Sequence, residues 1–126
     1  MIVLDTAALL YWTLAGEKLS AKGTQAIDGA QEIIISSNSI REIGLKARRG
    51  KLNLPLPAGE YVDRLKEVEK VLIVPVTEVT WLASLELVWD HIDPADRTIV
   101  ATATLLGCPL ITSDEQTLSF HAAALC

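Results

Sequence analysis

The segment DPADRTIVATATLLGCPLITSD, residues 93–114, contains a helix start, a helix and the strand that follows it. The Asp-Pro pair that opens the segment is typical of a helix N-terminus. The alanine-rich apolar run 95–106 favours a helix, and Gly107 and Pro109 separate it from the apolar pair at 110–111. A short, continuous apolar run of this kind is typical of a strand buried on both faces of a parallel sheet. The segment therefore predicts a helix–strand unit of an α/β domain.

The same alternation of short apolar runs and segments with helical spacing extends over the rest of the chain. Strands are expected at residues 2–4, 33–35, 72–76 and 110–111, and helices at 7–15, 23–30, 40–49, 59–71, 79–88 and 95–106. A repeated strand-then-helix order predicts an α/β fold with a mostly parallel sheet. The length of 126 residues fits a single domain, covering residues 1–126.

Composition restricts the class of protein. Half of the residues are hydrophobic, which is enough for a core, but no apolar run reaches the ~18 residues that a membrane span needs. The first residues have no signal-peptide pattern, so a cytoplasmic protein without membrane contact is expected. Two cysteines are too few for a disulfide framework or a zinc cluster. A net charge of −5 argues against a nucleic-acid coat protein, although it does not exclude a nuclease.

Four acidic residues are expected near one edge of the predicted sheet. Asp5 ends the first strand, and Asp114 follows the last strand. Glu42 lies in the first turn of the helix at 40–49, and Asp96 lies in the first turn of the helix at 95–106. Ligands of open parallel sheets bind at the carboxyl ends of the strands. Four carboxylates that converge there repel each other unless cations lie between them, and Mg²⁺ and Mn²⁺ prefer oxygen ligands. Two such ions ~4 Å apart can activate water for phosphodiester cleavage.

Each of these acids also has a purely structural interpretation. The run from Ser39 to Glu42 has the form of a capping box, and Asp93 and Asp114 can each cap a helix that follows them. Asp5 caps no helix that the sequence predicts, and an unpaired carboxylate at the end of a buried strand costs several kcal/mol. Asp5 is therefore the strongest single indication of a metal site.

Four segments that contain these acids, taken in order, resemble the motifs of the PIN-domain family and, within it, of the VapC-type toxins of bacterial toxin–antitoxin pairs. The matching segments are 2–6 (IVLDT), 37–43 (SNSIREI), 91–103 (HIDPADRTIVATA) and 110–114 (LITSD), together with the connection 49–55 (RGKLNLP). One departure is Arg41, where many relatives have tryptophan.

The resemblance implies a PIN-like three-layer α/β/α sandwich and a ribonuclease that depends on Mg²⁺ or Mn²⁺. It also implies an RNA substrate, a homodimer and a small antitoxin protein as partner. Asp5 and Asp96 become the expected direct metal ligands, whereas Glu42 and Asp114 become ligands that act through water. The expected supporting residues are Thr6 and Thr112, which orient carboxylates, and Asp93, which caps its helix.

Positive charges near the predicted site are the expected RNA contacts. Lys46, Arg48, Arg49 and Lys51 form a basic stretch that either binds phosphates or is a solvated helix face. Arg97 is expected to pair with Asp96 or with a phosphate. His91 is interpreted as structural, because two-metal hydrolysis does not need a histidine. Tyr11 and Trp12 are expected at the mouth of the site or in contacts elsewhere.

Several other functions remain open at this point. A phosphatase with an aspartyl nucleophile also places an acid after the first strand, but it usually has a second acid two residues later, where this chain has Ala7. A receiver-like signalling domain expects paired acids that are absent here. A PIN nuclease of RNA processing that is not a toxin, and an inactive PIN domain that only binds RNA or a partner, are the remaining alternatives.

Overall fold

The computed structural model describes residues 1–120, 124 and 125, with the last two described by their backbone alone. One sheet contains five strands in the order β3-β2-β1-β4-β5. The strands are β1 (Ile2–Leu4), β2 (Ile33–Ser36), β3 (Val71–Val74), β4 (Leu110–Ile111) and β5 (Ala124–Leu125). Every pair of neighbouring strands is parallel. The predicted parallel sheet is therefore confirmed, with β1 at its centre.

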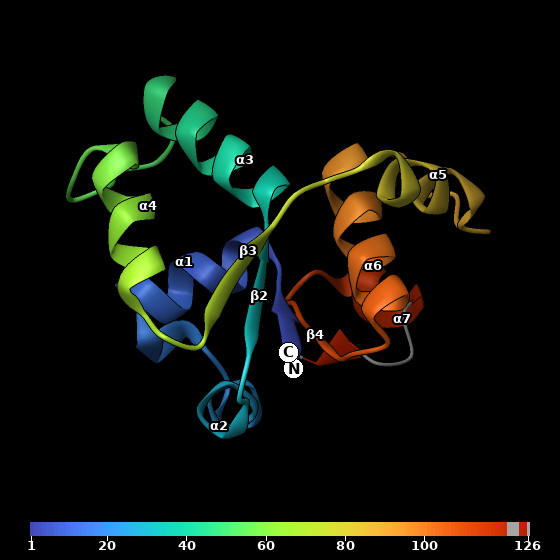
Figure 1. Cartoon of the computed structure of the whole chain (residues 1–126), viewed down its shortest axis with the longest axis horizontal. Helices are drawn as coiled ribbons and strands as arrows, with labels where there is room; N and C mark the ends of the chain where they lie inside the picture. The colour runs from blue at the N-terminus through green and yellow to red at the C-terminus, as the bar shows by residue number, and fades with distance from the viewer. Residues whose placement is uncertain (121–123, 126) are drawn as a thin grey trace.

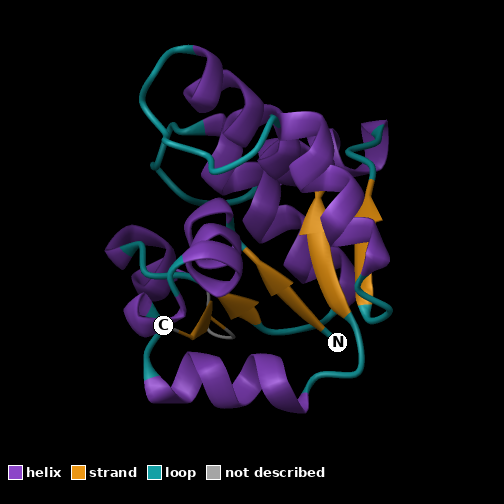
Figure 2. Ribbon diagram, turned by 90° about the vertical axis from the view of Figure 1, so that its left-hand side faces the viewer, coloured by secondary structure: helices purple, strands orange, loops and turns teal. Residues whose placement is uncertain are grey.

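Helices cover both faces of this sheet. They are α1 (Thr6–Leu14), α2 (Ala21–Gly29), α3 (Ser37–Arg48), α4 (Ala58–Glu67), α5 (Glu78–Glu86), α6 (Pro94–Leu106) and α7 (Glu115–Phe120), with a short 3₁₀ turn at Gly16–Lys18. Helices α1, α3 and α4 lie on one side of the strands and α5, α6 and α7 on the other (Figure 1). A view turned by 90° shows the strands enclosed by helices (Figure 2). The architecture is the predicted α/β/α sandwich.

Alternate residues of each strand enter two separate hydrophobic clusters, because successive side chains of a strand point to opposite faces. In β1, Ile2 and Leu4 pack with the residues under α1, α2 and α4, whereas Val3 packs with the residues under α6. In β2, Ile34 likewise joins the α6 side while its neighbours join the other. Burial on both faces explains why these strands are continuous apolar runs in the sequence.

The predicted element boundaries differ from the observed ones at several places. Helix α3 begins at Ser37 rather than at residue 40, because the Ser36 hydroxyl accepts a hydrogen bond from the Asn38 backbone N–H and starts the helix there. Helix α4 ends at Glu67, four residues earlier than predicted, because the chain enters β3 at Val71. Strand β5 has no counterpart among the predicted elements.

In the part of the chain that the structure describes, no helix is long and apolar enough to cross a membrane.

Candidate active site

All four predicted acids line one cavity at the carboxyl ends of the strands. The cavity has a volume of about 530 Å³. Its lining includes Asp5, Glu42, Asp93, Asp96, Asp114, Thr6, Tyr11, Lys46 and Ser113. Asp5 follows β1 directly and Asp114 follows β4 by three residues, while Glu42 and Asp96 project from α3 and α6. The structure therefore brings together the four acids that the sequence places at one edge of the sheet, and it does not test what they bind.

Asp5 is both the end of a buried strand and the N-cap of α1. Its Oδ1 atom accepts a hydrogen bond from the Ala8 backbone N–H at 2.7 Å. The expectation that Asp5 caps no helix is therefore wrong, because α1 begins at Thr6, one residue earlier than predicted. The role of Asp5 as a helix cap is therefore compatible with the metal-binding role that the sequence predicts for it.

The Asp5 carboxyl lies in an environment that favours its neutral form. Burial raises the pKa of Asp5 most strongly, hydrogen bonds from the Thr112 side chain and the Ala8 backbone lower it, and the charges of Asp96 and Asp114 raise it further. A carboxylate that is buried beside two others is stabilised by a bound cation, which removes the repulsion.

Glu42 is held by Thr6, the residue after Asp5. The Thr6 hydroxyl lies 3.2 Å from Glu42 Oε1 and 2.9 Å from the Ser39 hydroxyl, so it connects α1 to α3. Glu42 also pairs with Lys46 at 3.2 Å, one helical turn later. Because α3 begins at Ser37, Glu42 lies in the second turn and not in the first. The predicted capping box of Ser39 and Glu42 is wrong, since Ser36 is the N-cap.

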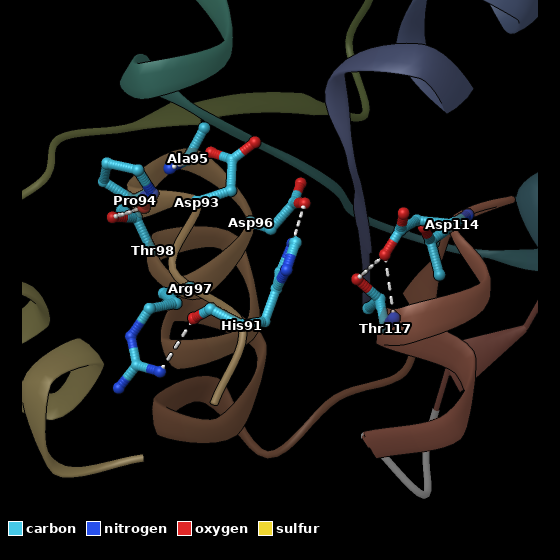
Figure 3. A network of polar contacts seen from close by, with 10 residues as sticks. His91, Asp93, Pro94, Ala95, Asp96, Arg97, Thr98, Asp114 and Thr117 are labelled. Carbon is cyan, nitrogen blue, oxygen red and sulfur yellow. Dashed lines mark hydrogen bonds and ion pairs between the residues drawn. The ribbon is translucent and has the colours of Figure 1, made fainter. Parts of the chain in front are cut away.

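Asp96 lies in the first turn of α6 and is bonded to a histidine. Its Oδ2 atom lies 2.6 Å from His91 Nε2, and Figure 3 shows the imidazole pointing to this carboxylate. Burial is the main cause that raises the pKa of Asp96, and the His91 hydrogen bond opposes it. The same bond raises the pKa of His91. The sequence interprets His91 as structural, and the structure places it in contact with one of the four acids, a contact that the sequence does not predict.

Asp114 is the N-cap of α7, as predicted. Its Oδ2 atom accepts hydrogen bonds from the backbone N–H and the hydroxyl of Thr117, at 2.8 and 2.7 Å (Figure 3). The Asp114 backbone N–H in turn donates to the Thr112 hydroxyl at 3.0 Å. Thr112 therefore holds the backbone of Asp114 and the side chain of Asp5 at once, and Thr6 acts in the same way on Glu42. Both threonines therefore contact carboxylates of the site, Thr6 that of Glu42 and Thr112 that of Asp5.

Asp93 has the predicted role of N-cap of α6. Its Oδ1 atom accepts a hydrogen bond from the Ala95 backbone N–H at 2.9 Å. It also lines the cavity, and one ligand atom each of His91, Asp93 and Asp96 lie within 4.8 Å of one another. This side chain is exposed, so capping accounts for its position.

The donor atoms around the cavity fit a divalent cation that prefers oxygen. Within the described residues, Lys46 is the one lysine or arginine that pairs with any of the four acids, and it pairs with Glu42. Asp5, Asp96 and Asp114 therefore have no lysine or arginine to balance their charges. Hydrogen bonds occupy one oxygen each of Asp96 and Asp114, which leaves the second oxygen of each for a cation. Carboxylate oxygens are the ligands that Mg²⁺ and Mn²⁺ prefer.

The predicted RNA contacts divide into three cases. Lys46 lines the cavity, whereas Arg48, Arg49 and Lys51 are exposed and outside its lining. Arg97 forms no ion pair with Asp96, because its guanidinium is turned away and bonded to backbone carbonyls (Figure 3). This group is therefore not available for a phosphate.

The two aromatic residues that the sequence places near the site line two different cavities. Tyr11 lines the acidic cavity, as expected, whereas Trp12 lines a separate apolar cavity between α1 and α4. Arg41, at the position where many relatives have tryptophan, is exposed, so this departure leaves the packing of the core unchanged. His121 lies outside the described residues.

Comparisons with known proteins agree with this geometry. The family profile described as PIN domain matches residues 2–124. The chain is 32% identical over 116 residues to Ribonuclease VapC22 of Mycobacterium tuberculosis, with coverage of 91% of this chain and 88% of the relative. Its fold is similar to that of M. tuberculosis VapC20, a toxin that cleaves the sarcin–ricin loop, with a TM-score of 0.67, 17% identity and coverage of 94% of both chains. A toxin–antitoxin complex from Klebsiella pneumoniae gives a TM-score of 0.69 at 17% identity, covering 100% of this chain and 97% of the other.

Proposed function

The chain belongs to the PIN-domain family, and on that premise we propose that it is a metal-dependent endoribonuclease of the VapC type, the toxin of a toxin–antitoxin pair. The observation that carries this proposal is the cavity into which Asp5, Glu42, Asp96 and Asp114 converge. The similarity to a ribonuclease over nine-tenths of the chain supports RNA as the substrate.

Asp5 and Asp96 are the proposed direct ligands of Mg²⁺ or Mn²⁺, and Glu42 and Asp114 are proposed to act through water. A bound cation would supply the Lewis acidity that activates water and neutralises the charge that develops on the phosphate. Partial burial of Asp5 and Asp96 supports their role, because a partly buried carboxylate has fewer water molecules to compete with a cation.

The other residues of the cavity keep these carboxylates in place. Thr112 holds Asp5, Thr6 holds Glu42, and Thr117 holds Asp114 through bonds of fixed direction. Lys46 provides a positive charge on the wall of the cavity, where it can approach an RNA phosphate. Because Asp5, Glu42 and Asp114 are fixed by backbone or hydroxyl groups and Asp96 is fixed by His91, little rearrangement is needed before cleavage.

The proposal includes two partners. An antitoxin is supported by the likeness of the fold to a chain of a toxin–antitoxin complex. A second copy of this chain is supported by α5, which exposes four large apolar side chains: Val79, Trp81, Leu82 and Leu85. Apolar side chains that gather on one helix face are typical of an interaction surface.

Substitution of Asp5 by Asn tests the catalytic assignment. Asn keeps an oxygen that can cap α1, but it removes the charge. We expect RNA cleavage to be abolished in the presence of Mg²⁺ or Mn²⁺, a greater loss than the ~10–100-fold that outer-shell partners of metal sites typically cost. Cleavage of a labelled RNA measures the effect, and circular dichroism confirms that the variant is folded.

Asp63→Asn is the matched control, because Asp63 is an exposed residue of α4 that does not line the cavity. We expect this variant to cleave RNA like the wild type. Full activity of Asp5→Asn would overturn the site, whereas loss of activity in both variants would point to misfolding.

Growth of cells that express the chain tests the toxin assignment. We expect expression to arrest growth and co-expression of a small protein encoded beside it to restore growth, because an antitoxin blocks the toxin by binding. Asp5→Asn should leave growth unaffected. A chain that cleaves RNA in vitro without slowing growth would instead be a nuclease of RNA processing.

A further inference from the structure

The loop between α5 and α6, residues 87–93, is held at two points. His91 of the loop contacts the acidic site, and Arg97 of α6 binds backbone carbonyls of the loop. His91 reaches from this loop to Asp96, with 2.6 Å between Nε2 and Oδ2. The His91 side chain is 17% exposed and that of Asp96 is 28% exposed. The contact is therefore shielded from much of the solvent, where a hydrogen bond to a charged group is stronger than at an open surface.

Arg97, which lies in α6, fixes the same loop by hydrogen bonds to backbone carbonyls of the loop and of the end of α5. Its Nη1 atom donates to the carbonyls of Trp89 and His91, at 2.5 and 3.1 Å. Its Nη2 atom donates to those of Ser84 and Leu87, at 2.7 and 3.0 Å, and Nε donates to Ser84 at 3.1 Å. All five N–H groups of the guanidinium thus have an acceptor.

The position of these carbonyls explains why an arginine is suited to this place. Ser84 is in the last turn of α5 and Leu87 is its C-cap, so their carbonyls lack partners within the helix. The C-terminal end of a helix also attracts a positive charge. The planar guanidinium binds several carbonyls at once, whereas a lysine ammonium has three donors and no fixed fork.

The His91 ring is held from a third direction by aromatic contacts. The ring centroid of Trp89 lies 4.8 Å from that of His91, and Trp89 stacks on Phe120 of α7 at 4.5 Å and an interplanar angle of 9°. The backbone of His91 is thus fixed by Arg97 and its ring is fixed by Trp89. Both contacts leave Nε2 directed at Asp96 (Figure 3).

We propose that His91 is a positioning residue that orients the Asp96 carboxylate for a divalent cation, and that Arg97 acts through His91 by fixing the loop 87–93. This inference rests on the proposed function, because Asp96 is a ligand only if the cavity binds a metal. With Oδ2 held by His91, the Asp96 side chain has one orientation at the wall of the cavity, and its other oxygen is left for a cation. The Asp96 side chain then loses its conformational entropy when the protein folds, so this cost does not weaken the binding of the metal.

Metal binding without RNA provides the first test. Isothermal titration calorimetry with Mg²⁺ and Mn²⁺ measures affinity in the wild type, in His91→Ala and in His91→Gln. We expect His91→Ala to weaken the binding of both cations about tenfold, the effect typical of an outer-shell partner. His91→Gln should recover part of the loss, because its amide N–H can donate from nearly the same place. Ile92→Ala is the matched control, since the neighbouring Ile92 is 89% exposed.

Each outcome separates the inference from the proposed function. Unchanged affinity in His91→Ala, beside a wild type that binds metal, overturns the inference alone. A loss for Mn²⁺ with unchanged Mg²⁺ binding also overturns it, because an imidazole that ligates metal directly favours Mn²⁺ over Mg²⁺. A wild type that binds neither cation overturns both the inference and the proposed function.

A double-variant cycle tests the role of Arg97. Arg97→Lys keeps the charge but cannot bind four carbonyls, so we expect it to weaken metal binding as His91→Ala does. The double variant should lose little more than either single variant, because both changes remove the same constraint on Asp96. Additive losses would show that Arg97 acts independently of His91 and would overturn the connection. Thermal unfolding of each variant confirms that the protein measured is folded.

Discussion

At the scale of single residues, the acids of the cavity show how one side chain serves two purposes. Asp5, Asp93 and Asp114 each accept a backbone N–H of the helix that follows them, and they also face the cavity. A helix N-terminus attracts negative charge, and the carboxyl ends of parallel strands place several such N-termini together. The fold thus stabilises carboxylates that would otherwise destabilise one another.

Tyr61 is a residue on which the pH dependence of stability can be tested. It is buried under α1, and its hydroxyl lies 2.8 Å from that of Thr13. Burial raises the pKa of Tyr61 and the Thr13 hydrogen bond lowers it, with burial the larger cause. Stability from the neutral phenol is therefore fully present below the unfolded pKa of about 10 and is lost as pH rises through the folded value.

We expect Tyr61→Phe to lower the free energy of unfolding by about 1 kcal/mol at pH 8, where it removes a hydrogen bond. The difference from the wild type should narrow above pH 10, because phenylalanine does not titrate. Urea unfolding at a series of pH values measures both effects. Thr13→Val is the control: it loses the same bond but keeps the titrating phenol. A gap that stays constant with pH would contradict the raised pKa.

The identity of the acids could be predicted from the sequence, but their contacts could not. Taken singly, each acid near a strand end or a helix start can be a simple cap, and only their joint placement at one edge of the sheet predicts that they meet. The bond from His91 to Asp96 depends on how the loop folds back over α6, which no local pattern states. A histidine five residues before an acid, across a helix N-cap, is the one feature that could have suggested it.

At the scale of elements, the C-terminus of α6 shows how one glycine ends a helix. Gly107 has φ +64°, the left-handed region that favours glycine, and its N–H donates to the Thr104 carbonyl. We expect Gly107→Ala to destabilise the protein by about 1 kcal/mol, because alanine is strained at positive φ. Denaturant unfolding measures the loss.

Gly44 provides the comparison for this substitution. It lies inside α3, and nothing is within 4 Å of an added Cβ. The same change, Gly44→Ala, should stabilise the protein by up to about 1 kcal/mol, because alanine has a higher helix propensity. Opposite signs at the two glycines support the backbone explanation, and equal signs would contradict it.

The sequence predicted the kind of each long element better than its ends. Six helices and four strands lie where the apolar spacing indicated, because spacing reports the face that is buried. The observed start of α3 is three residues before the predicted one. Ser36 and Ser39 are both suitable N-cap residues, and in the structure it is Ser36 that accepts the hydrogen bond from the Asn38 N–H. Strand β5 was missed because two residues of pairing leave no periodicity to detect.

At the scale of the whole molecule, a cation would connect elements that are distant in the chain. Asp5 directly follows β1, Glu42 and Asp96 lie in α3 and α6, and Asp114 directly precedes α7, so a bound ion would link both faces of the sheet. A ligand that binds only the folded state stabilises it, by about 2.7 kcal/mol at 100 times its Kd. We therefore expect Mg²⁺ or Mn²⁺ to raise the Tm of the wild type by several degrees.

The Asp5→Asn variant should be more stable than the wild type without a cation and should gain less stability when a cation is added. In EDTA it should unfold at a higher temperature than the wild type, because it lacks a buried charge beside Asp96 and Asp114. Added cations should raise its Tm less than that of the wild type. Differential scanning calorimetry measures both quantities, and an equal cation effect on the two proteins would contradict the role of Asp5 in binding.

The position of β1 between β2 and β4 has a consequence for the moment at which the protein becomes active during synthesis. Residues 33–36 and 110–111 must both be present before the first strand has its two neighbours, and Asp114 completes the four acids of the cavity only after both. A nascent chain therefore lacks part of the cavity until it has been synthesised beyond Asp114. The proposed ribonuclease is in this way kept inactive on its own message until that residue has been translated.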